Sequence, residues 1–208
     1  MDIKKFKQLK GNGYLVVDVR KPAEFAEGFI PCSLNLPPEA IHNDWAEWFL
    51  LEDRAFVLVG NEGQEQWATE ELKNRGFKEC YGFFVNGYQK WYEEGLDPDM
   101  VIRVFPEELK LDVKHDKDAR IIDIRPGAEF EKVHVKKATN IPLKTLFSQW
   151  QDLSEDKPHF VYGDNDASSM VVVSYLKMQD RHNFYQVAGT IEDFEEEGVP
   201  LEKASTKK

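Results

Sequence analysis

The sequence predicts an α/β fold that occurs twice, in two domains that each have a central parallel sheet flanked by helices on both faces. Short apolar runs alternate with helical segments along the chain, as in strand–helix–strand units with parallel strands. Asp18 and Arg20 recur as Asp123 and Arg125, 105 positions later. A repeat that spans half of 208 residues indicates two whole domains, because solenoid repeats have periods of about 20–50 residues.

The same offset relates further segments of the two halves. They are Glu24-Phe25 with Glu129-Phe130, and Asn35-Leu36-Pro37 with Asn140-Ile141-Pro142. We therefore expect a first domain at 1–97, a linker at 98–100, a second domain at 101–203 and a frayed tail at 204–208.

In the first domain, strands and helices are expected to alternate. Apolar runs bounded by turn residues predict strands at 14–19, 33–37, 55–59 and 79–84. Helical segments are predicted at 3–10, 21–27, 38–51, 66–74 and 88–94. Trp45, Trp48 and Phe49 share one face of the third helix and are expected in the core. Gly76 follows the fourth helix and suits a left-handed C-terminal cap.

The second domain repeats this order. The domain starts with the apolar segment 101–104, strands are predicted at 119–124 and 160–162, and helices at 169–179, at 191–197 and from Pro106 onward. Ser168 comes directly before a predicted helix, so we expect it to be the N-cap.

Charge and composition exclude several classes of function. The net charge is −11 and no run of five basic residues occurs, so nucleic acid and anionic membrane surfaces are not expected as partners. No apolar stretch approaches the ~20 residues of a membrane span, and the first residues do not resemble a signal peptide. We expect a soluble, cytoplasmic protein. Cys32 and Cys80 form no metal-ligand pattern, so no metal, cofactor or disulfide framework is expected.

Two loops follow the central strands and are the candidate sites. Ligands of parallel sheets bind beyond the carboxyl ends of the strands, and each loop leads into a helix N-terminus, where N–H groups can gather an anion. The loops consist of Gly60, Asn61, Glu62, Gly63, Gln64 and Glu65, and of Gly163, Asp164, Asn165, Asp166, Ala167 and Ser168.

The repeated motifs resemble the signature of rhodanese domains. The resemblance rests on the segments 18–20, 24–25, 28–31, 35–37, 75–77 and 86–91, and on the looser matches 123–125, 134–135, 140–142 and 188–189. It implies sulfur transfer through a persulfide on a cysteine that opens the loop, in a pattern like Cys-x-x-Gly-x-Arg. A helix N-terminus and an arginine would lower the pKa of such a thiol.

Both loops depart from that pattern. Gly60 and Gly163 stand at the cysteine position, and Glu65 and Ser168 stand at the arginine position. The loop carboxylates would repel thiosulfate and raise the pKa of a nearby thiol. We therefore expect both domains to be catalytically silent.

Three hypotheses follow for the function. The first is a binding or regulatory module for an unknown protein partner in sulfur metabolism. The second is a sulfurtransferase that uses an off-pattern cysteine such as Cys32, and the third is a dimerisation unit. The sequence does not specify the oligomeric state.

The remaining candidate residues are expected to be structural. Cys32 is expected to be a small buried apolar residue, although its segment could run near the carboxyl edge of the sheet. Cys80 has no cationic neighbour in the sequence, so a thiolate is disfavoured there. His134 is expected to cap or hydrogen-bond. The signature residues are expected to form ion pairs that brace the loops, namely Asp18, Arg20, Glu24, Asp123, Arg125 and Glu129.

Overall fold

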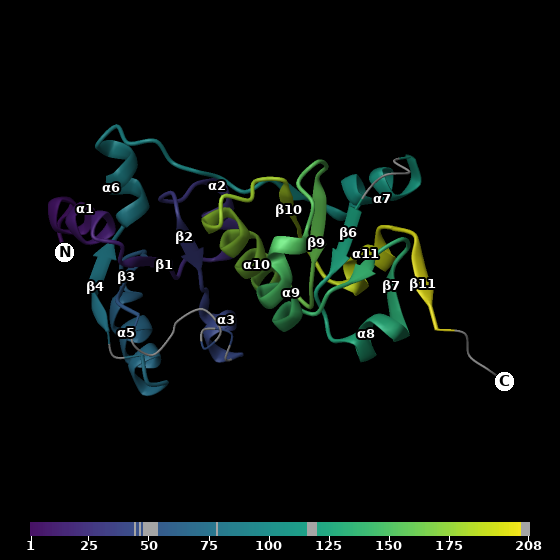
Figure 1. The fold of residues 1–208 in the computed structure, drawn as a ribbon, viewed down its shortest axis with the longest axis horizontal. Helices are drawn as coiled ribbons and strands as arrows, with labels where there is room; N and C mark the ends of the chain where they lie inside the picture. Colours follow the sequence, from purple (N-terminus) through teal and green to yellow (C-terminus); the bar gives the residue numbers. More distant parts are fainter. Residues whose placement is uncertain (44, 46, 48–53, 78, 116–119, 205–208) are drawn as a thin grey trace. The chain divides into compact units, whose positions relative to one another are not determined.

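A computed structural model of the chain describes residues 1–43, 45, 47, 54–77, 79–115 and 120–204 (Figure 1). Two compact units divide the chain, Met1–Val101 and Ile102–Lys208. Each unit is described by itself below. Among the described residues, no helix has the length and apolar character that crossing a membrane requires.

Unit 1 contains a four-stranded parallel sheet in the order β2-β1-β3-β4. Its strands are β1 (Leu15–Asp18), β2 (Ser33–Asn35), β3 (Phe56–Gly60) and β4 (Cys80–Val85). All residues of β1 and β3 are buried, as expected for central strands covered on both faces.

The described helices of unit 1 cover both faces of its sheet. They are α1 (Ile3–Gly11), α2 (Pro22–Glu27), α3 (Pro38–His42), α5 (Glu65–Asn74) and α6 (Gly87–Glu93). On one face, α1 contacts α6 and buries Phe6 and Leu9 against Val57 and Phe84. On the other side of the strands, α3 contacts α5.

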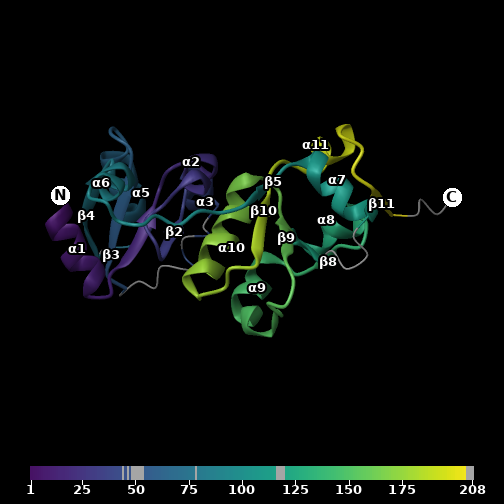
Figure 2. The same cartoon turned by 90° about the horizontal axis from the view of Figure 1, so that it is seen from above.

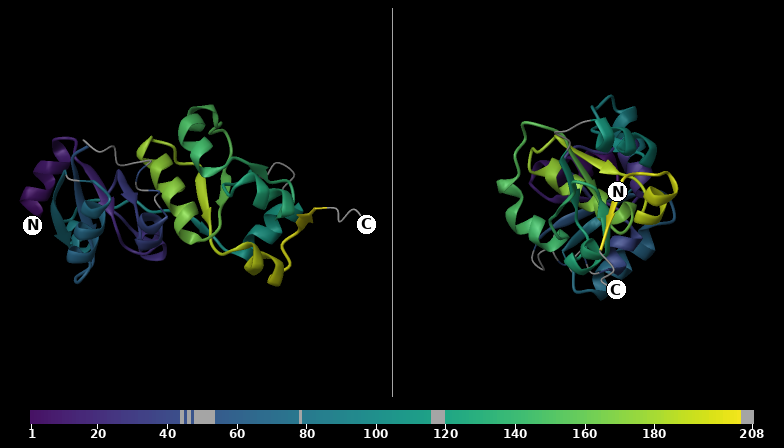
Figure 3. Two further views of the ribbon diagram at one scale, coloured as in Figure 1. Left: turned by 90° about the horizontal axis from the view of Figure 1, so that it is seen from below. Right: turned by 90° about the vertical axis from the view of Figure 1, so that its right-hand side faces the viewer.

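Unit 2 contains a five-stranded parallel sheet in the order β5-β10-β9-β6-β8. Its strands are β5 (Arg103–Val104), β6 (Arg120–Asp123), β8 (Thr139–Asn140), β9 (His159–Tyr162) and β10 (Phe184–Val187). A separate antiparallel pair joins β7 (Val133–Val135) to β11 (Leu201–Lys203), the yellow strand near the C-terminus in Figure 3.

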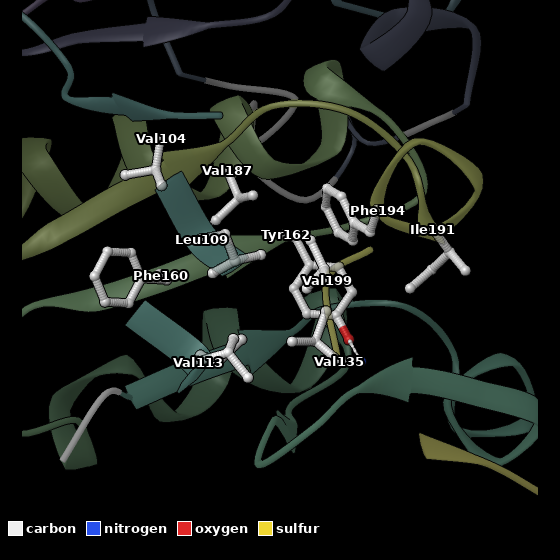
Figure 4. Close-up of a cluster of buried hydrophobic side chains, with 11 residues drawn as sticks. Val104, Leu109, Val113, Val135, Phe160, Tyr162, Val187, Ile191, Phe194 and Val199 are labelled. Carbon is white, nitrogen blue, oxygen red and sulfur yellow. Dashed lines mark hydrogen bonds between the residues drawn. The ribbon is translucent and has the colours of Figure 1, made fainter. Parts of the chain in front are cut away.

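The described helices of unit 2 are α7 (Pro106–His115), α8 (Gly127–Lys132), α9 (Leu143–Gln149), the 3₁₀ turn η1 (Trp150–Asp152), α10 (Asp166–Met178) and α11 (Ile191–Glu196). Helix α10 lies against β9 and β10 and contacts α9 (Figure 2). Figure 4 shows a buried cluster of this unit, in which Leu109 and Val113 of α7 and Phe194 of α11 meet Phe160 and Tyr162 of β9.

The predicted fold class is confirmed, since both units have a parallel sheet with flanking helices. Gly76 has φ +94° at the end of α5, so the predicted left-handed cap is also confirmed. The predicted helix 38–51 is too long, because α3 ends at His42 with Asn43 as its C-cap. Trp45 is only partly buried, whereas Trp48 and Phe49 lie outside the described residues. The antiparallel pair of β7 and β11 was not predicted. The predicted tail at 204–208 likewise lies outside the description, apart from Ala204.

Candidate functional site

Both candidate loops leave the carboxyl edge of a parallel sheet. Gly60 is the last residue of β3, and Gly163 directly follows β9. Each loop ends in the first turn of a helix, α5 in unit 1 and α10 in unit 2. This is the place in an open α/β sheet where ligands bind.

A buried ion pair braces the edge beside the loop in unit 1. Asp18 is fully buried, and its carboxylate accepts hydrogen bonds from Arg20 Nη2 (2.6 Å) and Nε (3.0 Å). Arg20 also donates to the carbonyl of Gly28 (2.9 Å), and its guanidinium lies over the ring of Tyr88. Asn35 donates to the carbonyls of Asp18 and Arg20, both at 3.0 Å. These bonds join three segments, so the pair fixes the backbone and is not available for chemistry.

The same brace recurs in unit 2. Asp123 is fully buried and accepts from Arg125 Nη2 (2.6 Å), which also donates to the carbonyl of Val133 (2.7 Å). Asn140 bridges the carbonyls of Asp123 and Arg125 at 3.0 and 2.9 Å. The aromatic partner differs, because Arg125 lies over Tyr162 of β9.

In unit 1, three successive N–H groups of the loop are bonded to side-chain oxygens of the chain itself. Asn61 donates to Gln64 Oε1 (2.7 Å), and Gly63 donates to Glu65 Oε2 (2.8 Å). Glu62 donates to Oδ1 of Asn86 (3.1 Å), in the turn after β4. In the sequence, Asn86 belongs only to the segment 86–91 of the family resemblance. Its place at the carboxyl edge is what brings its amide to the loop.

In unit 2, a capping box closes the loop. The N–H of Ser168 donates to Asn165 Oδ1 (3.0 Å), and the N–H of Asn165 donates to Ser168 Oγ (3.4 Å). The hydroxyl of Ser168 also donates to the carbonyl of Asn165 (2.8 Å). The prediction that Ser168 is the N-cap is therefore wrong. Helix α10 begins three residues earlier than expected, with Asn165 as the N-cap and Ser168 in the first turn.

Asp166 ties the loop of unit 2 to its surroundings. Its carboxylate accepts from Arg103 Nη2 (2.6 Å) and from the N–H of Gly189 (2.8 Å). Fully buried Gln186 accepts from Arg103 Nε (2.8 Å) and lies 3.4 Å from the Asp166 carboxylate. Sequence reasoning missed Arg103 and Gln186, because their relation to the loop depends on the pairing of β5 with β10.

The two loops leave little room at their first position. A Cβ added to Gly60 would lie 2.7 Å from Phe83 Cζ and 2.8 Å from Gln64 Oε1. A Cβ added to Gly163 would overlap the hydroxyl of Ser168. Contacts below 3.0 Å are not found for real Cβ atoms, so a side chain at either position requires its neighbours to move.

The carboxylates around the loops differ in what they contact. Glu24 accepts from the side chain of Asn61 (3.2 Å), whereas Glu129 pairs with Lys132 (2.7 Å), which lowers the pKa of Glu129. Glu62 and Asp164 are exposed residues. Loss of hydration raises the pKa of Asp164; Arg125 opposes this rise, whereas the nearby carboxylates add to it.

Neither cysteine lies at the carboxyl edge. Cys80 is opposite Phe56, the first residue of β3, and Cys32 precedes the first residue of β2. Both cysteines thus lie at the amino edge, about 13 Å from the level of Gly60 along the strand direction at ~3.3 Å per residue. The expectation that the Cys32 segment could run near the carboxyl edge is therefore wrong. Burial raises the pKa of the Cys80 thiol.

Cys32 is exposed, so the prediction of a buried apolar residue is also wrong. It occupies a turn with φ +63°. The counterpart 105 positions later is Lys137, which has φ +70° and is also exposed. Both domains therefore have a left-handed residue at this chain reversal. In the second domain that residue is a lysine, so the turn does not require a thiol.

His134 hydrogen-bonds through Nδ1 to the carbonyl of Phe130 (2.8 Å) and stacks on the Phe130 ring. Its Nε2 lies 3.5 Å from the carboxylate of Glu202 across the β7–β11 pair. In the part of the chain that the structure describes, no group of three His, Cys, Asp or Glu side chains could hold a metal ion.

Two α/β units, each with a parallel sheet and a braced loop after its central strand, define a tandem repeat of one fold. The rhodanese-like domain model matches residues 2–94 and again residues 105–197. The chain therefore belongs to the rhodanese-like family, within the sulfurtransferase superfamily, and contains two such domains.

Curated relatives match only part of the chain. YqhL of Bacillus subtilis (strain 168), an uncharacterized protein, is 32% identical over 73 residues, which are 35% of this chain and 58% of that protein. A probable molybdopterin-synthase adenylyltransferase of Porphyra purpurea is 34% identical over 29% of this chain and 16% of its own length. The thiosulfate sulfurtransferase GlpE of Ectopseudomonas mendocina (strain ymp) is 32% identical over 40% of this chain and 75% of its own length. The chain thus covers less than two thirds of the first two.

Solved structures resemble the chain at lower identity. A thiosulfate sulfurtransferase of Pseudomonas aeruginosa is 17% identical, with a TM-score of 0.45, over 93% of this chain and 41% of its own. The rhodanese-like domain of an Anabaena protein is 18% identical, with a TM-score of 0.47, over 52% of this chain and 85% of its own.

Proposed function

We propose that this protein is a catalytically silent tandem rhodanese-like protein that acts as a binding or regulatory module. The main support for the proposal is the distance between the two cysteines and the candidate loop of unit 1. The first position of each loop is glycine, while Cys32 and Cys80 lie at the amino edge of unit 1, about one strand length from its loop. A persulfide on either cysteine would form far from the loop N–H groups.

The second domain supports the same proposal independently. It contains no cysteine at all, so its loop has no nucleophile of the kind that sulfur transfer requires. Its loop is nonetheless held by hydrogen bonds, namely those of the capping box and those that the Asp166 carboxylate accepts. A loop that keeps its shape without a nucleophile is suited to recognition.

The charge of the loop surfaces indicates what they would recognise. Glu62 and Asp164 are exposed at the two loops. A pocket of about 350 Å³ borders Asp166 in unit 2, and its lining combines one cation, Arg103, with the carboxylates of Glu107, Asp193, Glu196 and Glu197. Such a surface favours a cationic group over thiosulfate. We therefore propose a protein partner that presents lysine or arginine side chains, in sulfur metabolism as the family suggests.

Sulfur transfer to cyanide tests the silent state. The purified chain is given thiosulfate, and in a second series mercaptopyruvate, with an active thiosulfate sulfurtransferase as positive control. We expect no thiocyanate above the enzyme-free rate. Turnover that disappears in Cys32→Ser would instead establish the off-pattern sulfurtransferase and overturn the proposal.

Partner capture tests the binding role. We expect Glu62→Lys and Asp164→Lys to weaken the retention of specific partners by the immobilised chain, with unchanged thermal unfolding. Glu70→Lys is the matched control, because Glu70 is an exposed carboxylate on α5 outside the loops. Equal retention by all variants would contradict recognition through the loops. A concentration-dependent mass would favour the dimerisation unit instead.

A further inference from the structure

The first residues of the two loops have backbones that any amino acid could adopt. Neither Gly60 nor Gly163 is among the glycines with positive φ, unlike Gly63 or Gly189. Glycine is therefore not required there by the conformation of the chain. What excludes a side chain at these positions is the packing of neighbouring atoms.

In unit 2, the excluding atom is the hydroxyl oxygen of Ser168. It overlaps the place of a Cβ on Gly163 and is the nearest atom to it. Two contacts with Asn165 fix the hydroxyl, one to its carbonyl (2.8 Å) and one to its N–H (3.4 Å). Ser168 is 2% exposed, and the next nearest atom to that Cβ is Ile124 Cγ1 at 3.0 Å.

In unit 1, a different residue supplies a comparable oxygen. Gln64 Oε1 would lie 2.8 Å from a Cβ on Gly60, and it is held by the N–H of Asn61 at 2.7 Å. Phe83 Cζ and Val19 Cγ2 also lie within 2.8 Å of that Cβ. Two loops of different sequence thus fill the same place with an oxygen of their own.

We propose that Ser168 closes the loop of unit 2 to a side chain at position 163, and that Gln64, together with Phe83 and Val19, closes the loop of unit 1 at position 60. Replacement of glycine alone then cannot restore a nucleophile, because the filling oxygen must leave as well. This inference rests on the proposed function, because that proposal places Gly60 and Gly163 where the family has its cysteine nucleophile.

A double-mutant cycle on the full chain tests this role through the urea midpoint of unit 2. We expect Gly163→Ala to lower the midpoint by on the order of 1 M, because overpacking a filled site is costly. Ser168→Ala in the same chain should restore at least half of that loss. If Gly163→Ala does not fold, folding of the double variant gives the same answer.

Ser169→Ala provides the matched control cycle. The Ser169 hydroxyl is also buried and bonds to Asn165 and Gln186, but it is not among the atoms nearest Gly163. We expect the coupling between Gly163→Ala and Ser169→Ala to be much smaller than in the Ser168 cycle, because the Ser169 hydroxyl does not meet the added Cβ. Additive effects in the Ser168 cycle would overturn the proposed role.

The corresponding cycle in unit 1 should show weaker coupling. Gln64→Ala removes one of three close atoms, so it should recover only part of the loss caused by Gly60→Ala. Failure of these cycles is distinguishable from failure of the proposed function. Turnover of thiosulfate by the wild-type chain would overturn the silent state without affecting the cycles, and additive cycles would leave the silent state intact.

Discussion

The two loops occupy the same place in their units but are held by different partners. In unit 1, Gln64 and Glu65 bond to the loop that contains them, and Asn86 adds one bond from the turn after β4. In unit 2, Asp166 bonds outward to Arg103 of β5 and to Gly189. The difference follows from the sheets, since β5 flanks β10 in unit 2, while β4 is the edge strand of unit 1. The closed loop is common to both domains, whereas its anchors depend on the strands available nearby.

The brace beneath the loops is the shared feature, and its loss should have the largest effect. Asp18→Ala and Asp123→Ala each leave a nearly buried arginine without its carboxylate. We expect each to cost about 3–5 kcal/mol of the unfolding free energy of its own unit. Urea unfolding monitored by circular dichroism measures the loss.

The matched control for the brace is Glu129→Ala. Glu129 is paired with Lys132, but both side chains are substantially exposed. Its removal should leave the unfolding free energy of unit 2 nearly unchanged. A loss below about 1 kcal/mol in both aspartate variants would show that the brace is not the common support of the two loops.

The next largest effect should be a difference in stability loss between the two units when the carboxylate that holds each loop is removed. Asp166→Ala removes hydrogen bonds from Arg103 and from Gly189, so we expect a loss of about 1.5–3 kcal/mol from unit 2. Glu65→Ala removes a single exposed hydrogen bond from unit 1 and should cost about 0.5 kcal/mol or less. The same urea experiment compares them. Equal losses would contradict the outward anchoring of the second loop.

A buried histidine should make unit 2 more sensitive to acid than unit 1. Burial lowers the pKa of His159, and Arg120 adds to the effect. As the pH falls below about 6.5, the unfolded chain binds the proton first, so stability falls by up to ~1.4 kcal/mol per pH unit. The corresponding first residue of the central strand in unit 1 is Phe56, which does not titrate.

His159→Phe tests this difference between the units. We expect the variant to lose less stability than the wild type between pH 7 and pH 5, measured by thermal unfolding across that range. His182→Asn is the control, because His182 is an exposed histidine of the same unit. Identical pH profiles for His159→Phe and the wild type would assign the acid sensitivity to other groups.

Local sequence signals predicted the sheets well because they depend on runs of apolar residues and on turn chemistry. The strands around Asp18 and Asp123 and the cap at Gly76 follow from such signals. The pairing of β11 with β7 could not be predicted in this way. Leu201–Lys203 is short and mostly polar, and its partner lies more than sixty residues away.

The site was less predictable for two reasons. Some of its contacts join residues far apart in the sequence, and at the start of α10 two neighbouring residues could each serve as the N-cap. Ser168 and Asn165 are both good N-caps, and the sequence alone favoured the wrong one. The link from Asp166 to Arg103 spans 63 positions and depends on the strand order. Neither the filling of position 163 by a hydroxyl nor that of position 60 by an amide can be derived from residue types.

The smallest expected effect is at Cys32. The general tendency of cysteine to be buried predicted a core residue, but the residue lies exposed at a chain reversal. Because φ is +63°, Cys32→Gly should relieve backbone strain and raise the unfolding free energy of unit 1 by about 0.5–1 kcal/mol. Cys32→Ser removes the thiol but keeps the strain, so it should leave thermal unfolding nearly unchanged. If serine and glycine had the same effect, the thiol itself would matter. A gain specific to glycine would assign the position to the turn that Lys137 forms in unit 2.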